Sequence, residues 1–366
     1  MINRKISVLS LALGLFAAFA VLADTDRDVA ELKQAYADYE KYISEDDLES
    51  ALPLAKRALE LGEVVFAPDS PNLAALNHNY GSILIDLEKF GEAKPVLKSA
   101  VKRYEAIYGK ESEEMILVLM DLGHASGEFY DARAQKYAYR RALRLVEKYD
   151  GRNSLPYGRH ALKAGTYIFE YSRSPDAQPF LEDAVEVFTT VLGREHPSTG
   201  FAAFNLGKFN LARKRYSAAR DNFLIALNSF EYPDKPSNQL EMSTHAFLVQ
   251  VYEEMKESTE ATKHCLAIGR MSPAREDQDY QPLFRISPKY PQVAQERGKE
   301  GHVDVRFTVD ESGFVKNVAV DNSTHKYFER SALEAIESWR YAPRFEEGEP
   351  VSTDGVRTRL TFQFSD

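Results

Sequence analysis

Apolar residues recur at intervals of three and four along most of the chain, which is the pattern of amphipathic α-helices. The pattern is clearest in residues 74–90, 114–129, 200–213 and 218–230. Short runs rich in Pro, Gly and Asp separate such stretches, at residues 67–71, 108–110, 150–153, 194–197 and 232–234. The larger part of the chain is therefore predicted to consist of successive helices joined by short loops.

The helical part repeats itself every 42 residues, as four glycines show: Gly81, Gly123, Gly165 and Gly207. Twelve residues after each glycine, and one period outward on both sides, stand mostly small residues: Ala51, Ala93, Gln135, Ala177, Ala219 and Ala261. Seven residues further on, the same register gives Ala58, Ala100, Ala142, Ala184, Ala226 and Ile268. Small residues are needed where two helices cross closely, so the spacing predicts six units of paired helices, with Gln135 as an exception.

Beyond residue 271 the period changes from helical to two. Val303, Val305, Phe307 and Val309 alternate with polar residues, residues 310–313 supply a turn, and residues 314–320 form a returning strand. Residues 328–341 form an amphipathic helix that stops before Pro343, and residues 356–364 alternate as a third strand. The fold class is thus α+β and multidomain: an all-α solenoid over residues 24–270, a linker over 271–282, and a small ββαβ domain over 283–366.

The N-terminus has the layout of a secretory signal peptide. Arg4 and Lys5 precede seventeen uncharged residues from Ile6 to Leu22, and Ala23 offers a small residue for cleavage. An uncleaved transmembrane anchor is the alternative, because seventeen apolar residues reach the lower limit for spanning a bilayer. Either way, residues 1–23 are expected to direct the rest of the chain out of the cytoplasm.

The formal net charge is −10, and no segment is densely basic. This composition argues against nucleic acid or an anionic membrane surface as the main partner. Residues 283–366 hold 12 Lys and Arg against 14 Asp and Glu, so the negative charge lies mainly in the helical part. Such a surface favours basic partners, although solubility alone would also account for it.

Nothing in the sequence resembles an active site, and no cofactor or metal is expected. Glu241 and His245, like Glu260 and His264, are four residues apart on predicted helices, but neither pair has the HExxH context of a zinc site. The single cysteine, Cys265, cannot form an internal disulfide, and it falls in the repeat column of core residues that holds Leu97, Tyr139, Leu181 and Phe223. A catalytic site of unrecognised type remains the minor alternative.

The small residues at twelve-then-seven spacing resemble the tetratricopeptide repeat family. The loop Leu192-Gly193-Arg194-Glu195-His196-Pro197 is similar to the linker of its 42-residue variety, and a HEAT-type solenoid is the alternative with a similar period. The resemblance implies a superhelix whose first helices line a concave face that binds another protein. On that face it would expose His78, Ser82, His124, Arg159 and Lys208.

The terminal domain resembles the C-terminal domain of the TonB energy transducers. The motifs Pro288-Lys289-Tyr290-Pro291, Glu300-Gly301-His302-Val303-Asp304-Val305-Arg306-Phe307 and Trp339-Arg340-Tyr341-Ala342-Pro343 occur in that family's order. The resemblance implies a periplasmic protein, in a Gram-negative envelope, whose last strand pairs with a segment of an outer-membrane transporter. The residues it assigns to partner binding are Arg285, Ser287, Tyr290, Val356, Thr358, Leu360 and Phe362.

Two features depart from the energy transducers. Their membrane anchor carries a histidine that couples to a proton-driven motor, whereas the first histidine here is His78, and their Pro-rich spacer is replaced by the solenoid. The leading hypothesis is a TonB-family protein that supports energy-dependent transport and holds a second envelope protein through its repeats. A scaffold for envelope complexes, without energy coupling, is the alternative.

Overall fold

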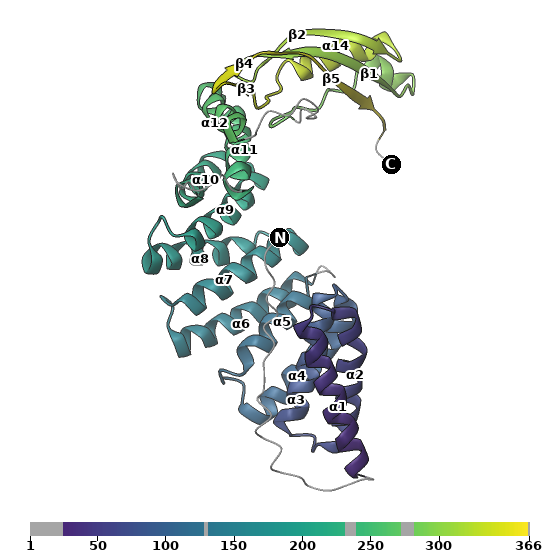
Figure 1. Cartoon of the computed structure of the whole chain (residues 1–366), viewed down its shortest axis with the longest axis vertical. Helices are drawn as coiled ribbons and strands as arrows, with labels where there is room; N and C mark the ends of the chain where they lie inside the picture. The colour runs from purple at the N-terminus through teal and green to yellow at the C-terminus, as the bar shows by residue number, and fades with distance from the viewer. Residues whose placement is uncertain (1–24, 128–130, 231–238, 272–281, 365–366) are drawn as a thin grey trace. The chain divides into compact units, whose positions relative to one another are not determined.

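The computed structural model describes residues 25–127, 131–230, 239–271 and 282–364 (Figure 1). The predicted export segment, the loop at 232–234 and almost all of the predicted linker lie outside these residues. The chain divides into two compact units, residues 1–191 and 192–366, which are described separately. No helix in the described ranges is long and apolar enough to cross a membrane.

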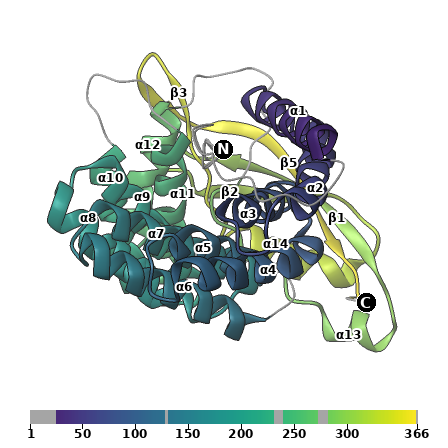
Figure 2. The same cartoon turned by 90° about the horizontal axis from the view of Figure 1, so that it is seen from below.

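The first unit consists of helices that pack in chain order, each on the next. Its elements are α1 (Thr25–Ser44), α2 (Leu48–Val65), α3 (Pro71–Asp86), α4 (Phe90–Tyr108), α5 (Met115–Ala125), α6 (Ala132–Asp150), α7 (Leu155–Tyr167), the π-helical turn η1 (Ile168–Ser172) and α8 (Ala177–Leu192). The first helices of successive pairs, α3, α5 and α7, also lie side by side, as Figure 2 shows. This is the predicted arrangement of paired helices.

The second unit begins with two more helix pairs: α9 (Pro197–Ala212), α10 (Tyr216–Phe230), α11 (Gln239–Glu254) and α12 (Ser258–Met271). With α1 to α8 they make the six predicted pairs, and both alanine columns are buried along their whole length. A Cβ on Gly81 would lie 2.6 Å from Leu97, and one on Gly207 would lie 2.7 Å from Phe223. The repeating glycines are therefore required by the close crossing of the two helices in a pair.

Gln135, the exception in the alanine column, is accommodated by a second change in the same unit. Its side chain is fully buried, and its Oε1 accepts a hydrogen bond of 2.6 Å from Ser172 Oγ on η1. A Cβ at position 127 would lie 2.6 Å from Gln135 Nε2, so the larger side chain fits only because residue 127 is glycine. The large side chain of Gln135 therefore occupies the space that a side chain at position 127 would need.

Three glycines that end second helices also follow the repeat: Gly109, Gly151 and Gly193, with φ of +88°, +87° and +89°. This left-handed region favours glycine because a Cβ would be strained there. The predicted loops at 108–110, 150–153 and 194–197 thus follow second helices that all end at a glycine in the same left-handed conformation.

The rest of the second unit is the small mixed domain. Its elements are α13 (Gln292–Glu296), β1 (Gly301–Val309), β2 (Val315–Ser323), α14 (Lys326–Ile336), β3 (Arg344–Glu346), β4 (Glu349–Val351) and β5 (Thr353–Phe362). The main sheet is antiparallel in the order β2-β1-β5, and α14 packs on β1 and β2 (Figure 1). Val303, Val305, Phe307, Phe328 and Trp339 lie in its buried core, so the predicted ββαβ order is confirmed.

Two details of this domain were not predicted. The helix ends at Ile336 rather than at 341, because Arg340 and Tyr341 donate backbone hydrogen bonds to Phe284 and Gly313 instead of continuing the helix. The hairpin of β3 and β4 follows, and Gly348 in its turn has φ of +89°. Strands of three residues are too short to show a period of two in the sequence.

Candidate functional site

The last long strand, β5, lies at one edge of the main sheet. It pairs along its length with β1, from Gly301 and Phe362 to Val309 and Thr353. Within the part of the domain that the structure describes, its other side pairs with no strand. Backbone donors and acceptors on that side are consequently available to an added strand.

The opposite edge, β2, is less suited to accept another strand. Its pairing with β1 shifts register twice, between Asp304 and Val305 and between Arg306 and Thr308. Asn317 in β2 has φ of +51°, outside the extended region. Such irregularities interrupt the even spacing of edge hydrogen bonds and protect a strand from pairing. β5 has one shift of its own, between Phe307 and Val309 of β1, close to Gly355 with φ of +75°, but its pairing from Val356 to Phe362 is unbroken. The two edges are therefore not equivalent, and residues 356–362 of β5 form the more regular stretch.

The predicted contact residues on β5 differ in what their side chains can do. Leu360 and Phe362 are 4% and 3% exposed and belong to the domain core. Their side chains point away from any partner, and only their backbone groups are available at the edge. Val356 and Thr358 lie on the same face of the strand and are half-buried.

The opposite face of β5 is charged and exposed. Arg359 donates to Asp304 on β1, with distances of 2.6 and 2.9 Å, and Arg357 lies 3.4 Å from Asp321 on β2. The Arg359 guanidinium lowers the pKa of the Asp304 carboxyl. This ladder of ion pairs spans the three strands and leaves the edge of β5 uncovered.

The other predicted contact residues precede α13. Arg285 and Ser287 are exposed, and Tyr290 is half-buried. The Tyr290 ring stacks on Phe364 with centroids 5.0 Å apart and meets the edge of Phe362, while its hydroxyl donates to the carbonyl of Lys299. Tyr290 is thus part of the packing at the end of β5, and the segment before it leads toward that end.

Among the residues predicted to be exposed on the repeats, His78 is instead buried. It is 6% exposed, and its Nε2 lies 2.9 Å from Asp121 Oδ2, which joins α3 to α5. Burial opposes ionisation of Asp121, but the hydrogen bond from His78 and the charge of Lys163 outweigh it and lower the pKa to about 2. The predicted exposure of His78 was wrong because a carboxylate on the neighbouring first helix draws the ring inward.

His124 is likewise buried, at 3% exposed. Its ring stacks on Tyr167 of α7, with centroids 3.8 Å apart and planes 15° from parallel, and also contacts Phe90. An aromatic neighbour on the next first helix therefore turns a predicted surface residue into a core residue. The 42-residue register places both histidines on the correct helices but does not show which neighbours they meet.

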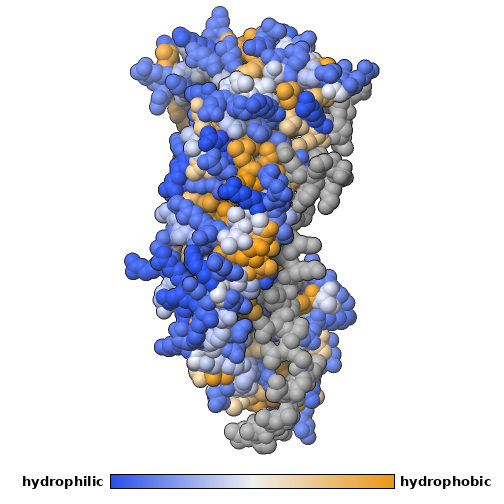
Figure 3. Space-filling view, turned by 90° about the vertical axis from the view of Figure 1, so that its left-hand side faces the viewer, coloured by the Kyte–Doolittle hydropathy of each residue, from blue (hydrophilic) through white to orange (hydrophobic). Residues whose placement is uncertain are grey.

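The remaining predicted residues on the repeats reach the surface to different degrees. Arg159 is exposed, while Ser82 and Lys208 are half-buried, and the Lys208 ammonium lies 5.8 Å from the Phe204 ring centroid. The face of the molecule in Figure 3 is mostly hydrophilic, and apolar residues reach it in separate patches. Recognition on the repeats is thus expected to combine polar and apolar contacts.

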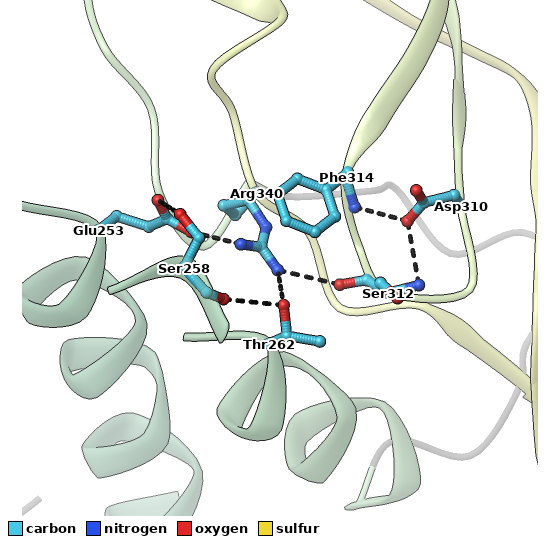
Figure 4. A network of polar contacts seen from close by, with 7 residues as sticks. All are labelled: Glu253, Ser258, Thr262, Asp310, Ser312, Phe314 and Arg340. Carbon is cyan, nitrogen blue, oxygen red and sulfur yellow. Dashed lines mark hydrogen bonds and ion pairs between the residues drawn. The ribbon is translucent and has the colours of Figure 1, made fainter. Parts of the chain in front are cut away.

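A polar network that the sequence did not reveal joins the mixed domain to the last helix pair (Figure 4). Arg340, only 1% exposed, donates to Glu253 on α11, to Thr262 Oγ1 on α12 at 2.7 Å, and to the carbonyl of Ser312 at 3.0 Å. Its guanidinium lies 3.7 Å from the centroid of the Phe314 ring. The second unit is therefore one continuous packed body, in which α11 and α12 hold the domain directly.

The groups around Arg340 are themselves fixed in place. Ser258 Oγ donates to Glu253 Oε2 at 2.8 Å, and Asp310 accepts from the backbone N–H groups of Ser312 and Phe314 (Figure 4). Arg340 belongs to the Trp-Arg-Tyr motif, but a motif confined to one domain cannot indicate a contact with helices outside that domain. The sequence feature that could have indicated this contact is the position of a charged residue, Arg340, between two core aromatic residues, Trp339 and Tyr341.

The histidines and the cysteine that were considered as metal ligands or nucleophiles are packed between helices. His245 Nδ1 and His264 Nδ1 are 2.7 Å apart, and burial lowers the pKa of each ring to about 4. Cys265 is fully buried, as expected of a core position, and burial raises its pKa to about 12. Across the ranges that the structure covers, no three His, Cys, Asp or Glu side chains are grouped to hold a metal ion.

Two protein-family models match the chain. A model described as the Gram-negative bacterial TonB protein C-terminal matches residues 286–364, and a tetratricopeptide repeat model matches residues 42–106. Both are protein-interaction modules. The match at 286–364 covers β1 to β5 and the segment with Tyr290, so the candidate edge lies inside it.

Two curated relatives are similar to the same part of the chain. Protein TonB of Pseudomonas aeruginosa is 34% identical over 90 residues, which are 24% of this chain and 26% of the relative. Protein TonB of Vibrio cholerae is 35% identical over 69 residues, which are 19% of this chain and 28% of the relative. The chain thus spans about a quarter of the length of the curated relatives it matches.

Solved structures are similar to the two parts separately. The solution structure of the Pseudomonas aeruginosa TonB C-terminal domain is 33% identical, with 25% of this chain and 92% of that chain covered and a TM-score of 0.22. A putative kinesin light chain from Podospora anserina with TPR-like repeats is 14% identical, with 56% and 95% covered and a TM-score of 0.47. The repeat register and the family matches together indicate an array of helix pairs that matches the tetratricopeptide repeat model at residues 42–106, followed by a domain that matches the TonB C-terminal model at residues 286–364.

Proposed function

We propose that this is a periplasmic protein that supports energy-dependent transport across the outer membrane. In this proposal residues 1–23 direct export, residues 24–270 bind another envelope protein, and residues 283–366, after a linker at 271–282, bind a transporter. The partner segment adds as a strand to the open side of β5. The chain acts by binding and carries no catalytic or cofactor site of its own.

The open edge of β5 is the observation that supports the transporter role. It lies in a domain that matches the TonB C-terminal model, its pairing with β1 is unbroken from Val356 to Phe362, and β2 at the other edge is irregular. Strand addition draws its affinity from the backbone, so the buried Leu360 and Phe362 do not prevent it. Val356, Thr358 and the exposed Arg285, Ser287 and Tyr290 segment would supply side-chain selectivity.

A scaffold without energy coupling is the second candidate, and one observation favours it. The sequence before α1 contains no histidine, and the first one, His78, is buried in the repeats beside Asp121. The apolar segment at residues 6–22 therefore holds no histidine that could couple to a proton-driven motor. Transport support would then require a motor engaged through another subunit.

A binding measurement with synthetic peptides tests strand addition. The full exported chain is titrated with peptides from the N-terminal segments of outer-membrane transporters of the same cell, and each peptide is compared with a copy that carries N-methylated backbone amides. Strand addition predicts binding that N-methylation abolishes. Equal binding of both forms would exclude pairing through the backbone of β5.

Crosslinking in intact envelopes separates the two candidates. Photoreactive residues are placed at Thr358 and Gln363 on the edge and at Lys208 on the repeats. Capture of a transporter at the edge supports the transport role. Capture only at Lys208, with nothing or a second copy of the chain at the edge, supports the scaffold.

A further inference from the structure

The first unit contains a cavity of about 440 Å³, and of the residues predicted to bind a partner on the repeats only His78 lines it. It opens between the first helices α3, α5 and α7, at the ends of α4 and α6, and residues such as Ala75, Leu117 and His160 line it. Its size is within the range of pockets that hold small ligands or single anchoring side chains. Part of its lining comes from the first helices, which the resemblance to tetratricopeptide repeats implies bind a partner.

The wall of this cavity is aromatic on one side. Tyr104 and Tyr108 come from the end of α4, with ring centroids 5.7 Å apart, and the Tyr104 ring meets the edge of His78. Tyr104 is buried, whereas Tyr108 is 38% exposed. One ring of the cavity lining is thus buried, and the other is partly exposed to solvent.

The rest of the rim carries only negative charge. Glu113 and Glu114 precede α5, and Asp150 ends α6; all three are exposed, and none forms an ion pair within the described part of the chain. Glu114 lines the same cavity as Tyr104 and Tyr108, and after burial its charge contributes to raising the pKa of both tyrosines. No Lys or Arg lines the cavity.

Nearby positive charges do not neutralise this rim. Lys163 lies 3.8 Å from Asp121 and 5.7 Å from the Tyr167 ring centroid, so it is engaged below the cavity. The ring of His160 lines the cavity but stays neutral at pH 7, since burial and then Lys163 lower its pKa to about 4. Arg159 is exposed and does not belong to the lining.

We propose that this cavity binds an arginine side chain of a partner protein. Its planar guanidinium would stack on the Tyr108 ring and donate to the carboxylates of Glu113 and Glu114. Lysine would keep the charge but lose the planar stacking and the paired hydrogen bonds. The inference rests on the proposed function, in which the repeats hold an envelope protein, and it adds that the bound segment is basic.

Methyl NMR spectra of the full exported chain test this inference. The probe is a five-residue acetylated peptide with a central arginine flanked by alanine and glycine. The matched probe carries citrulline, which keeps the shape and loses the charge. We expect the arginine peptide to shift the methyl signals of Ile116 and Leu117 at the cavity, and the citrulline peptide to leave them unchanged. No shift, or equal shifts with both, would overturn the proposal.

A charge-matched pair of variants identifies the site. Glu114→Gln is expected to weaken binding of the arginine peptide about fivefold, which corresponds to one partly exposed charge interaction. Glu111→Gln removes the same charge three residues away, outside the lining, and is expected to leave binding unchanged. Equal weakening by both variants would mean a diffuse negative field rather than a site, and would also overturn the proposal. Tyr108→Leu should weaken binding of the arginine peptide more than binding of a third peptide that carries lysine at the central position.

Two further results separate this inference from the proposed function. In the first, a photoreactive residue at Leu117 captures an envelope protein, but the arginine peptide leaves the NMR spectrum unchanged. This result would refute the basic ligand and keep the partner role of the repeats. Binding of the arginine peptide without any captured protein supports the cavity and refutes the partner role. Spermidine that binds more tightly than the arginine peptide would make the occupant a free polyamine and exclude a partner protein.

Discussion

The repeat helices and strand β5 offer partners two different kinds of surface. In α3, α5 and α7 the backbone hydrogen bonds are satisfied within each helix, so only side chains such as Tyr108 and Glu114 are available to a ligand. β5 keeps one row of backbone groups unpaired, while its inward side chains Leu360 and Phe362 are buried. In the proposed function the repeats would select a partner by its chemistry, whereas β5 would select mainly by an extended backbone.

The largest expected effect tests how firmly α11 and α12 hold the terminal domain. Arg340→Ala removes a buried guanidinium and leaves Glu253 without its cation, which should lower the free energy of unfolding by about 4 kcal/mol. Urea unfolding followed by fluorescence reports this directly, because Trp339 is the single tryptophan and lies in the domain core.

Arg340→Met serves as the control for this network, since it keeps most of the buried volume while removing the charge. Combined with Glu253→Met it should recover much of the lost stability, because no unpaired charge then remains buried. A loss below about 1 kcal/mol for Arg340→Ala would show that the contact with the helices contributes little.

The next largest loss of stability is expected from a substitution at the point where two repeat helices cross. Gly207→Val would place a Cβ 2.7 Å from the buried Phe223 ring, so we expect a loss of about 3 kcal/mol, measured by circular dichroism during urea unfolding. Ala212→Val in the same helix is exposed and should change stability by less than about 0.5 kcal/mol. Equal effects would argue against close crossing as the reason for the repeating glycine.

A smaller effect depends on pH and distinguishes a buried carboxylate from an exposed one. The pKa of Asp121 is lowered from 3.8 to about 2, so its contribution of about 2 kcal/mol is present above pH 4 and is lost as the pH falls toward 2. Asp121→Asn should remove this part of the pH dependence, measured as urea midpoints between pH 2 and 5. Asp304→Asn in the exposed sheet ladder should alter the same curve less.

The smallest effect is expected for an arginine on the open face of the sheet. Arg359→Gln breaks the bonds to Asp304, but both groups are exposed and water replaces them. The tryptophan fluorescence midpoint should therefore stay the same within error, in contrast to Arg340→Ala. A large loss would mean that the ladder of ion pairs, rather than the core under it, stabilises the sheet.

Some features could be predicted because they repeat or alternate. The glycines at 42-residue spacing, the buried alanine columns and the strands β1, β2 and β5 follow from period and residue size alone. The hairpin of β3 and β4 and the early end of α14 could not be predicted, since three-residue strands show no period and the helix ends through backbone bonds to distant residues.

By itself the sequence determined the six helix pairs and the change to a ββαβ domain, because both depend on local periodicity. The edge position of the last strand was implied by the family resemblance and not by periodicity. Only the tertiary structure decided that His78 and His124 are buried, that Arg340 bonds to α11 and α12, and that Tyr108, Glu114 and Asp150 share one cavity. These depend on which side chains meet across helices distant in sequence. A repeat register fixes the position of a residue in its helix, but its partners, burial and charge environment arise from the packing of several helices together.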